Sequence, residues 1–138
     1  LSLSLSLSLS LSLSSQIYLL YAFTRIRAIR RQLGASQLGH LETESMEVVP
    51  SLATKEEKEL AFIISQFPDV VLGFENKLQP HLLCDYLFKL SGKFHLFYER
   101  CKVLGNDKTL SRLQICFATE GVMERGLRLL GVTPVERM

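Results

Sequence analysis

The sequence predicts an all-α protein, a bundle of about five helices around one core. Apolar residues recur at helical spacing in five segments after residue 15, and none of these segments alternates apolar and polar residues as a half-exposed strand would. Most connections between the segments are short, as in helical bundles. A length of 138 residues leaves room for a single domain. We therefore expect one helical domain over residues 16–138.

The first fifteen residues differ from the rest of the chain. They read LSLSLSLSLSLSLSS, with neither the basic start of a signal peptide nor the unbroken apolar run of a membrane span. A CT dinucleotide repeat encodes alternating Leu and Ser in every reading frame. We interpret residues 1–15 as a translated repeat or a gene-model artefact, a disordered low-complexity tract outside the domain.

The first helix is expected from residue 16 to Leu33. Gly34 follows at a typical C-cap position, and residues 35–53 are polar, acidic and interrupted by glycine and proline, which indicates a loop. At about 100° per residue, one stripe of this helix is apolar and should face the core. Its members are Leu19, Ala22, Phe23, Ile26, Ile29 and Leu33.

Capping residues mark the second and third helices. Thr54 and Glu57 form a capping-box pair that opens the second helix, and Pro68 should lie near its end. Asp69 can then cap the third helix, which should end near Gln79.

Two longer helices complete the expected bundle. Pro80 suits the first position of the fourth helix, where a missing amide hydrogen is harmless. The segment LGNDK separates this helix from the fifth, which Gly131 should end.

No catalytic or metal site emerges from the sequence. The histidines lack metal-ligand spacing, and a Cys84–His81 nucleophile would still need an orienting partner and an oxyanion site. Glu56 and Glu57 are adjacent, so we expect them to point apart in a solvated first turn. The three cysteines lie in apolar surroundings without CxxC spacing, which indicates free thiols in a reducing compartment. We expect a cytoplasmic protein, with an organelle as the open alternative.

The first helix also carries the candidate binding residues. Residues 16–34 hold four arginines and no acid, and Tyr18, Tyr21 and Arg25 fall on one shoulder of the apolar stripe. Aromatic rings beside cations can stack a base and hold a phosphate. A solvated basic face with half-buried tyrosines is the alternative, and composition alone favours it. Further candidates are Arg27 and Arg31, expected towards solvent, with Arg30, Arg100 and Lys102.

Four stretches in order carry a family resemblance over residues 16–138. They are YLLYAFTRIRAI, KELAFIISQFPDVV, LQPHLLCDYLFKLSGKFHLFYERCKVL and RLQICFATEGVMERGLRLLGVTPVERM. The first is similar to the Tyr-x-x-Tyr-Ala-x-x-Arg helix that opens the C-terminal anticodon-binding domain of arginyl-tRNA synthetases, the DALR domain. The others resemble the segments that follow it in that domain.

The resemblance implies a helical bundle that grips the anticodon stem and loop of arginine tRNA, not DNA. It implies that Tyr21 stacks on or packs against an anticodon base, that Tyr18 and Arg25 support it, and that Met138 closes the pocket. Phe23 stands where the family usually has His, but it lies on the core stripe. The other proposed RNA contacts, to phosphates, are Arg27, Arg31 and Lys102.

The resemblance covers only part of such an enzyme. A class I synthetase also needs a His-x-Gly-His-type motif and a Lys-Met-Ser-Lys-type loop, and the chain has neither. We expect no catalytic residues and no cofactor here, because ATP and Mg²⁺ would act in a catalytic domain that is missing and that would be a partner. The chain alone should be inactive as an arginine–tRNA ligase. The alternative is a helical protein-interaction module with a basic amphipathic helix.

Overall fold

The computed structural model describes residues 13–45, 51–77, 80–105 and 108–131, and over these ranges it is all-α, as predicted. Its helices are α2 (Leu13–Ser45), α3 (Lys55–Ser65), α4 (Phe67–Lys77), α5 (Pro80–Arg100) and α6 (Thr109–Leu129). In its described part, none of these helices has the length and apolar character needed to span a bilayer.

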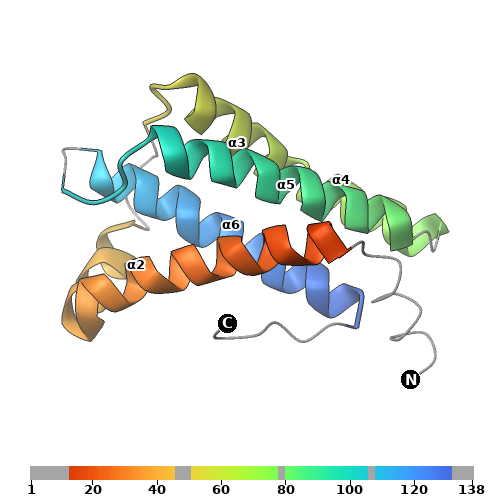
Figure 1. Ribbon diagram of the computed structural model, residues 1–138, viewed down its shortest axis with the longest axis horizontal. Coiled ribbons are helices and arrows are strands. Elements are labelled where there is room, and N and C mark those ends of the chain that lie inside the picture. Colours follow the sequence, from red (N-terminus) through yellow and green to blue (C-terminus); the bar gives the residue numbers. More distant parts are fainter. Residues whose placement is uncertain (1–12, 46–50, 78–79, 106–107, 132–138) are drawn as a thin grey trace.

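Helix α5 lies at the centre of the bundle, in contact with each of the other four helices. Figure 1 shows α2 and α5 running in the same direction, with α6 returning behind them and α3 and α4 following one another along the other side of α5. This order places α2 and α3 on opposite sides of α5. One long edge of α5 therefore borders α2.

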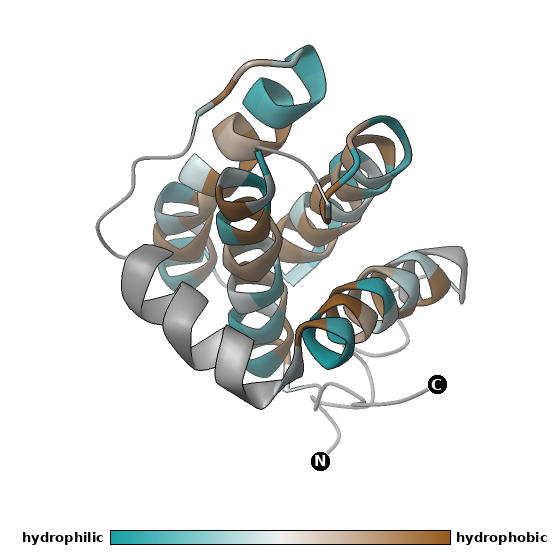
Figure 2. Cartoon of the chain, turned by 90° about the vertical axis from the view of Figure 1, so that its left-hand side faces the viewer, coloured by the Kyte–Doolittle hydropathy of each residue, from teal (hydrophilic) through white to brown (hydrophobic). Residues whose placement is uncertain are grey.

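The core is built from large apolar side chains of α2, α3, α5 and α6. Figure 2 shows the hydrophobic sides of the helices turned towards one another and the hydrophilic sides turned outwards. Burying one such side chain stabilises the fold by about 1.5–3 kcal/mol, so these contacts dominate the packing. The largest fully buried apolar side chains are Phe23, Ile26, Leu60, Leu83, Leu87, Leu90, Phe94, Phe97, Leu113, Met123 and Leu130.

The predicted apolar stripe of α2 is confirmed. Leu19, Ala22, Phe23, Ile26 and Ile29 are buried, and the sixth member, at position 33, is partly buried against the core. Because the stripe fixes how α2 is rotated against the bundle, it also fixes which of its polar residues border α5 and which border α6.

Both ends of α2 extend beyond the expected helix. It begins at Leu13, so the last three residues of the Leu-Ser tract are helical, while residues 1–12 lie outside the described residues. Gly34 ends the first part, with φ 73° and ψ 158°, a conformation that favours glycine. Residues 35–45 then form a second helical part rather than the expected loop, because no proline follows before residue 50. Figure 1 shows this part turning away from the first.

The start of α3 agrees with the predicted capping box, but the next boundary does not. The Thr54 hydroxyl accepts a hydrogen bond from the Glu57 amide at 3.2 Å. Helix α3 ends at Ser65 and α4 already begins at Phe67, so Pro68 lies in the first turn of α4 instead of near the end of α3. Proline is tolerated there because the first amides of a helix have no helical partner.

The first turn of α3 is only partly solvated, which corrects the expectation for Glu57. Glu56 forms an exposed ion pair with Arg100, at 3.0 Å. Glu57 is 0% exposed, and its carboxylate accepts hydrogen bonds from the Ala53 amide and from Arg112. Burial by itself would raise the pKa of Glu57, but these bonds outweigh it and lower the pKa below its usual value. The carboxylate therefore stays charged inside the fold.

Helices α5 and α6 approach closely at Gly126. A Cβ atom added at Gly126 would lie 2.8 Å from Cδ2 of the fully buried Leu87, closer than real contacts of a Cβ atom. Beyond α6, Gly131 adopts φ 78°, in agreement with its predicted role in ending the helix. Pro80 opens α5 as predicted.

Candidate nucleic-acid interface

The predicted shoulder of α2 lies along α5. Tyr18 is 45% exposed and Tyr21 is 49% exposed, so both rings reach solvent although the stripe beside them is buried. Tyr21 lies one turn from Tyr18 and one turn from Arg25 on the same side of the helix. The three residues therefore form a continuous row at the α2–α5 edge.

Aromatic residues of α5 hold Tyr18 in place. Its ring meets Phe88 edge-on, with centroids 5.8 Å apart, and meets His95 at 5.4 Å. The ring nitrogen Nε2 of His95 lies 3.0 Å from the carbonyl oxygen of Tyr18. Burial lowers the pKa of His95, as does the nearby Arg25 charge, which favours the neutral ring. Tyr18 is thus held by an aromatic cluster of α5.

Arg25 covers a second aromatic ring of α5. Its guanidinium carbon lies 4.6 Å from the centroid of the Tyr98 ring, within the range of a cation–π contact. Such a contact orients the charge without neutralising it, because a ring supplies no counter-ion. Arg25 therefore keeps its positive charge at the edge.

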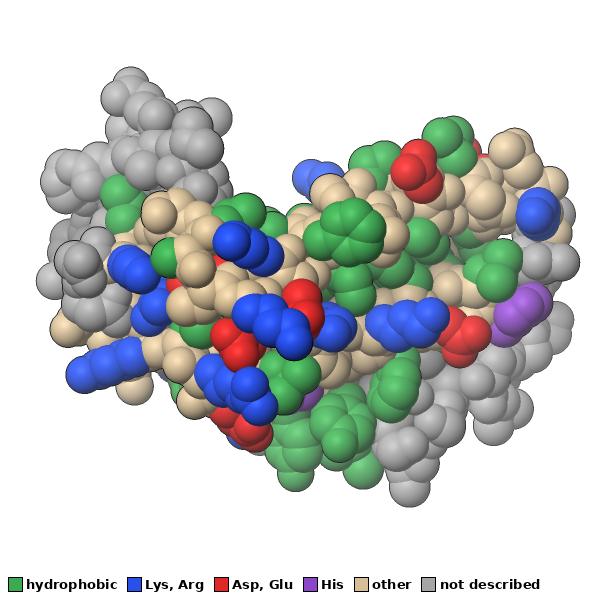
Figure 3. All heavy atoms as spheres, turned by 90° about the horizontal axis from the view of Figure 1, so that it is seen from above, with side chains coloured by type: hydrophobic (Ala, Val, Ile, Leu, Met, Phe, Trp, Pro, Cys, Tyr) green, Lys and Arg blue, Asp and Glu red, His purple; other side chains and the backbone are tan. Residues whose placement is uncertain are grey.

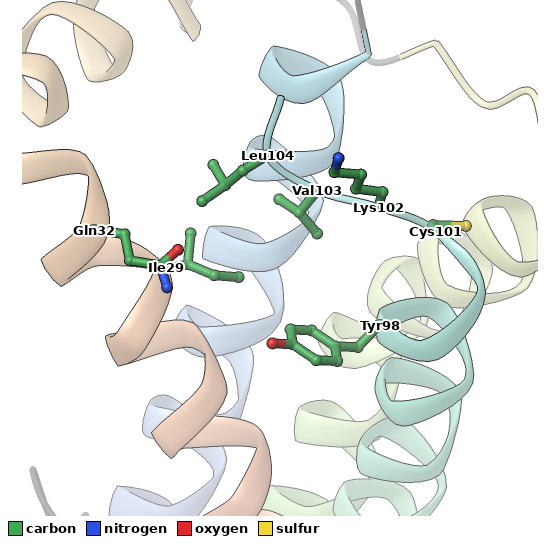
Figure 4. Close-up of a pocket in the computed structure, with 7 residues that line it drawn as sticks. All are labelled: Ile29, Gln32, Tyr98, Cys101, Lys102, Val103 and Leu104. Atoms are coloured by element: carbon green, nitrogen blue, oxygen red, sulfur yellow. The ribbon is translucent and has the colours of Figure 1, made fainter. Parts of the chain in front are cut away.

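Tyr98 also lines a pocket of about 260 Å³ between α2 and the end of α5. In Figure 4 the Tyr98 ring projects from α5 towards α2, and Leu104 lies across the pocket from it. The sulfur of Cys101 points away, and it lies 3.4 Å from the Thr54 hydroxyl oxygen. The pocket combines an aromatic ring, apolar walls and one lysine, and its lining residues are Ile29, Gln32, Tyr98, Cys101, Lys102, Val103 and Leu104.

The other edge of α2 faces α6 and differs in character. Arg30 donates two hydrogen bonds to Oε1 of Glu120, at 2.8 and 3.1 Å, and stacks over the ring of Phe117 at 4.1 Å. Arg27 lies against Oε2 of Glu120, with Nε 3.7 Å away. Its side chain is only 31% exposed, so the expectation that Arg27 points to solvent is wrong. The reason is that Glu120 stands beside it on α6.

The remaining candidates are distributed differently. Arg31 is exposed, as predicted, and Lys102 is exposed at the rim of the pocket. Arg100 pairs with Glu56, and Met138 lies outside the described residues. The structure thus brings Tyr18, Tyr21, Arg25 and Lys102 to one side of the bundle and directs Arg27 to another.

The face formed by α3 and α5 shows mixed charge. Figure 3 views the molecule from this side, and basic and acidic side chains lie next to one another there. Lys93 and Lys55 both pair with Glu59, at 3.0 and 3.8 Å. An anion gains little from basic groups that already have acidic partners. The α2–α5 edge is therefore the better candidate for RNA.

The α5 half of this edge was not predicted from the sequence. Phe88, His95 and Tyr98 are spaced i, i+7 and i+10, which places them on one side of the helix. Tyr98 is only half-buried and forms a wall of the pocket. The spacing of these three aromatic residues can be read from the sequence. Only the position of α2 beside α5 shows that they border the tyrosines of α2.

The structure offers no support for a Cys–His nucleophile. Cys84 is buried whereas His81 is exposed, and all three cysteines are buried thiols outside any disulfide, as predicted. Burial raises the pKa of Cys116 to about 12, which keeps that thiol protonated. Within the described ranges, no group of three His, Cys, Asp or Glu side chains is placed to hold a metal ion.

Comparison with known proteins adds a family match. Residues 19–138 match the model of the DALR anticodon binding domain. An arginine–tRNA ligase of Pseudomonas syringae pv. syringae is 39% identical over 124 residues, and the cytoplasmic arginine–tRNA ligase of Gallus gallus is 39% identical over 129 residues. Each alignment covers 88% of this chain but 20% and 19% of the relative. The chain thus spans about a fifth of the length of these relatives.

Solved structures show the same fold. The arginyl-tRNA synthetase of Plasmodium falciparum matches with a TM-score of 0.73 and 31% identity, over 88% of this chain and 21% of that protein. A protein from Campylobacter jejuni, described as a putative arginyl tRNA synthetase, matches with a TM-score of 0.76 over 88% of this chain and 26% of that one. At 21% identity, the second match supports the fold alone.

Proposed function

Because this chain belongs to the DALR anticodon-binding domain family, we propose that it binds the anticodon stem and loop of arginine tRNA through the α2–α5 edge. The observation that carries the proposal is the pocket beside Tyr98, with Arg25 stacked on its ring and Lys102 at its rim. An aromatic wall flanked by cations suits a nucleobase joined to phosphates.

The pocket is proposed to receive one unstacked base. RNA loops are read when a base leaves its stack and its edge becomes accessible. A volume of about 260 Å³ suits a ligand smaller than a drug-sized molecule, such as a single base. Tyr98 would stack on this base, and the Gln32 amide could hydrogen-bond to its edge.

The exposed tyrosines of α2 extend the contact. Tyr21 would stack on or pack against a neighbouring anticodon base, with Tyr18 and Arg25 holding the row in place. Stacking of a base on an aromatic side chain contributes about 1–3 kcal/mol. The cations Arg25, Arg31 and Lys102 would contact phosphates, which fixes the register of the RNA without reading its sequence.

The first test is binding of the full chain to an arginine-tRNA anticodon stem–loop and to a copy with a swapped anticodon, at two salt concentrations. We expect tighter binding of the arginine anticodon, with a difference that survives added salt because stacking and base contacts release few counter-ions. Weak binding of both RNAs, with a parallel loss of affinity in salt, would leave only phosphate contacts and would contradict the proposal.

Two variants assign any preference to the pocket. Tyr98→Leu keeps an apolar wall but removes the stacking ring, so it should reduce the preference for the arginine anticodon. Phe62→Ala removes an aromatic ring that is 65% exposed on α3, and it should leave both affinities unchanged. Equal effects of the two variants would remove the pocket from the proposal.

A protein-interaction module with a basic amphipathic helix is less well supported. The apolar stripe of α2 is buried in the bundle, so a groove on a partner protein could bind it only if α2 dissociated from the other helices. On its α6 side, Arg27 and Arg30 already face Glu120. Preference for one anticodon over another would separate the two functions.

Arginine–tRNA ligation is proposed only for a longer enzyme of which such a domain is a part, since the chain covers a fifth of the ligases it resembles. ATP and Mg²⁺ are proposed to act in the remainder of that longer enzyme. The three buried thiols suit a reducing compartment, and we infer the cytoplasm.

A further inference from the structure

Behind the pocket, one buried guanidinium joins three segments of the chain. Arg112 lies in the first turn of α6, and its Nε donates to Oε1 of Glu57 at 2.9 Å. Its Nη1 donates to the backbone carbonyl of Lys102 at 2.6 Å. Arg112 thus connects α6 with the start of α3 and with the loop that follows α5.

The α3 end of this connection is rigid. The second carboxylate oxygen of Glu57 accepts the Ala53 amide at 3.0 Å, and the Glu57 amide donates to Thr54. Glu57 is fully buried and charged, so the guanidinium beside it has a fixed counter-ion. Arg112 therefore has one stable geometry from which its other nitrogens can reach the loop.

The loop end of the connection forms a wall of the pocket. After α5 ends at Arg100, the carbonyls of the chain leave the helical pattern and need other donors. Arg112 supplies such a donor to the carbonyl of Lys102. Figure 4 shows Lys102, Val103 and Leu104 lying along one side of the pocket. This bond from Arg112 fixes the backbone from which the Lys102 side chain extends.

We propose that Arg112 is a positioning residue for RNA binding. It holds the backbone of residues 101–104 so that Lys102 meets a phosphate of the RNA seated in the pocket. This inference rests on the proposed function of the same site. Arg112 itself is buried and acts only through Lys102.

A double-mutant cycle on the full chain tests the inference. The variants are Arg112→Lys, Lys102→Ala and their combination, and the readout is affinity for the arginine-tRNA anticodon stem–loop. Lysine keeps a cation beside Glu57 but lacks the planar fork that serves both acceptors. Each single variant should lose about fivefold in affinity, the size of one exposed charge contact, and the double variant should lose no more. The salt slope should fall by about 0.7 in each single variant.

Two further measurements separate positioning from stability. Amide hydrogen exchange at Val103 and Leu104 should be faster in Arg112→Lys and unchanged in Lys102→Ala. Ile64→Ala removes apolar contacts between α3 and the core but leaves both bonds of Arg112, so it should lower stability without changing the affinity of the folded protein. Arg128→Lys, an exposed change on the same helix, is the matched control and should change neither.

The outcomes are distinct. Additive losses in the cycle, or an equal loss in Ile64→Ala, would overturn the positioning role while the wild-type preference for the arginine anticodon remained. Absence of that preference in the wild-type chain would overturn the proposed function and this inference together.

Discussion

The two edges of α2 carry the same residue type in opposite roles. On the α5 side, Arg25 lies over the Tyr98 ring and keeps its charge, with exposed tyrosines beside it. On the α6 side, Arg27 and Arg30 face Glu120, whose side chain is only 10% exposed. Arg25 and Arg30 are five residues apart, about 140° around the helix. That rotation separates an arginine available to a ligand from one that stabilises the fold.

A nearly neutral protein can present a local basic surface when many of its other charges are paired. The formal net charge is only +2, and several basic groups are paired, including those of the α3–α5 face. At the α2–α5 edge, by contrast, Arg25 lies over an aromatic ring. Such an edge can attract an anion although the whole molecule scarcely does.

The largest effect is expected at the α6 edge. Glu120→Ala should reduce the free energy of unfolding by about 2 kcal/mol, because two partly buried arginines would lose their counter-ion. Water that reaches the two guanidinium groups would offset part of the cost. Chemical denaturation measures the change. Glu124→Ala, which removes an exposed pair with Arg128 on the same helix, is the control and should lose less than about 0.5 kcal/mol. Similar losses in both would show that Glu120 has no special role.

At the α5 edge the expected effect is on binding instead of folding. Tyr21→Ala should weaken binding of the arginine-tRNA stem–loop by about 1–3 kcal/mol, the contribution of one stacked base. Its unfolding free energy should hardly change, since the ring is half exposed. We expect this loss to exceed the effect of Arg31→Ala on discrimination between tRNAs. If both variants lost affinity equally for all tRNAs, the stacking role of Tyr21 would be wrong.

A smaller effect should distinguish the individual arginines. Arg31→Gln should lower affinity for every RNA alike, with a fall of about 0.7–0.9 in the salt slope for one lost phosphate contact. Arg27→Gln should leave that slope unchanged, because Arg27 faces Glu120. Titrations over a range of salt concentrations give the slopes. Identical slopes for the two variants would mean that the pairing with Glu120 does not keep Arg27 from RNA.

The smallest effect is a pH dependence at the α5 edge. Burial lowers the pKa of His95 from its ordinary value of 6.5. Its contribution to stability is therefore fully present above pH 6.5 and declines as pH falls through the lower folded pKa, where a proton must be added to a half-buried ring. Thermal unfolding between pH 7.5 and 5 should show this decline reduced in His95→Gln. An unchanged pH dependence in the variant would exclude His95 as its cause.

Periodicity and capping residues were sufficient to predict most of the fold. The apolar stripe of α2, the Thr54 cap, the opening of α5 at Pro80 and the end of α6 near Gly131 are all local features. Each depends on residues within about one turn of one another, so the sequence alone contains the information. The four family motifs and their order along the chain could also be recognised from the sequence alone. The helical residues after Gly34 were missed because a single glycine can redirect a helix as well as end it.

The roles of the charged and aromatic side chains were decided by the tertiary structure. A helical wheel gives the direction of a side chain but not the neighbour that stands there. Arg30 and Glu120 are 90 residues apart, and Glu57 and Arg112 are 55 apart. The sequence by itself determined where the helices form and which stripe is buried. Only the packing of the helices decided that Tyr98 forms a pocket wall, that Glu57 is buried and that Arg25 lies over an aromatic ring. Those outcomes depend on contacts between segments that are distant in the sequence.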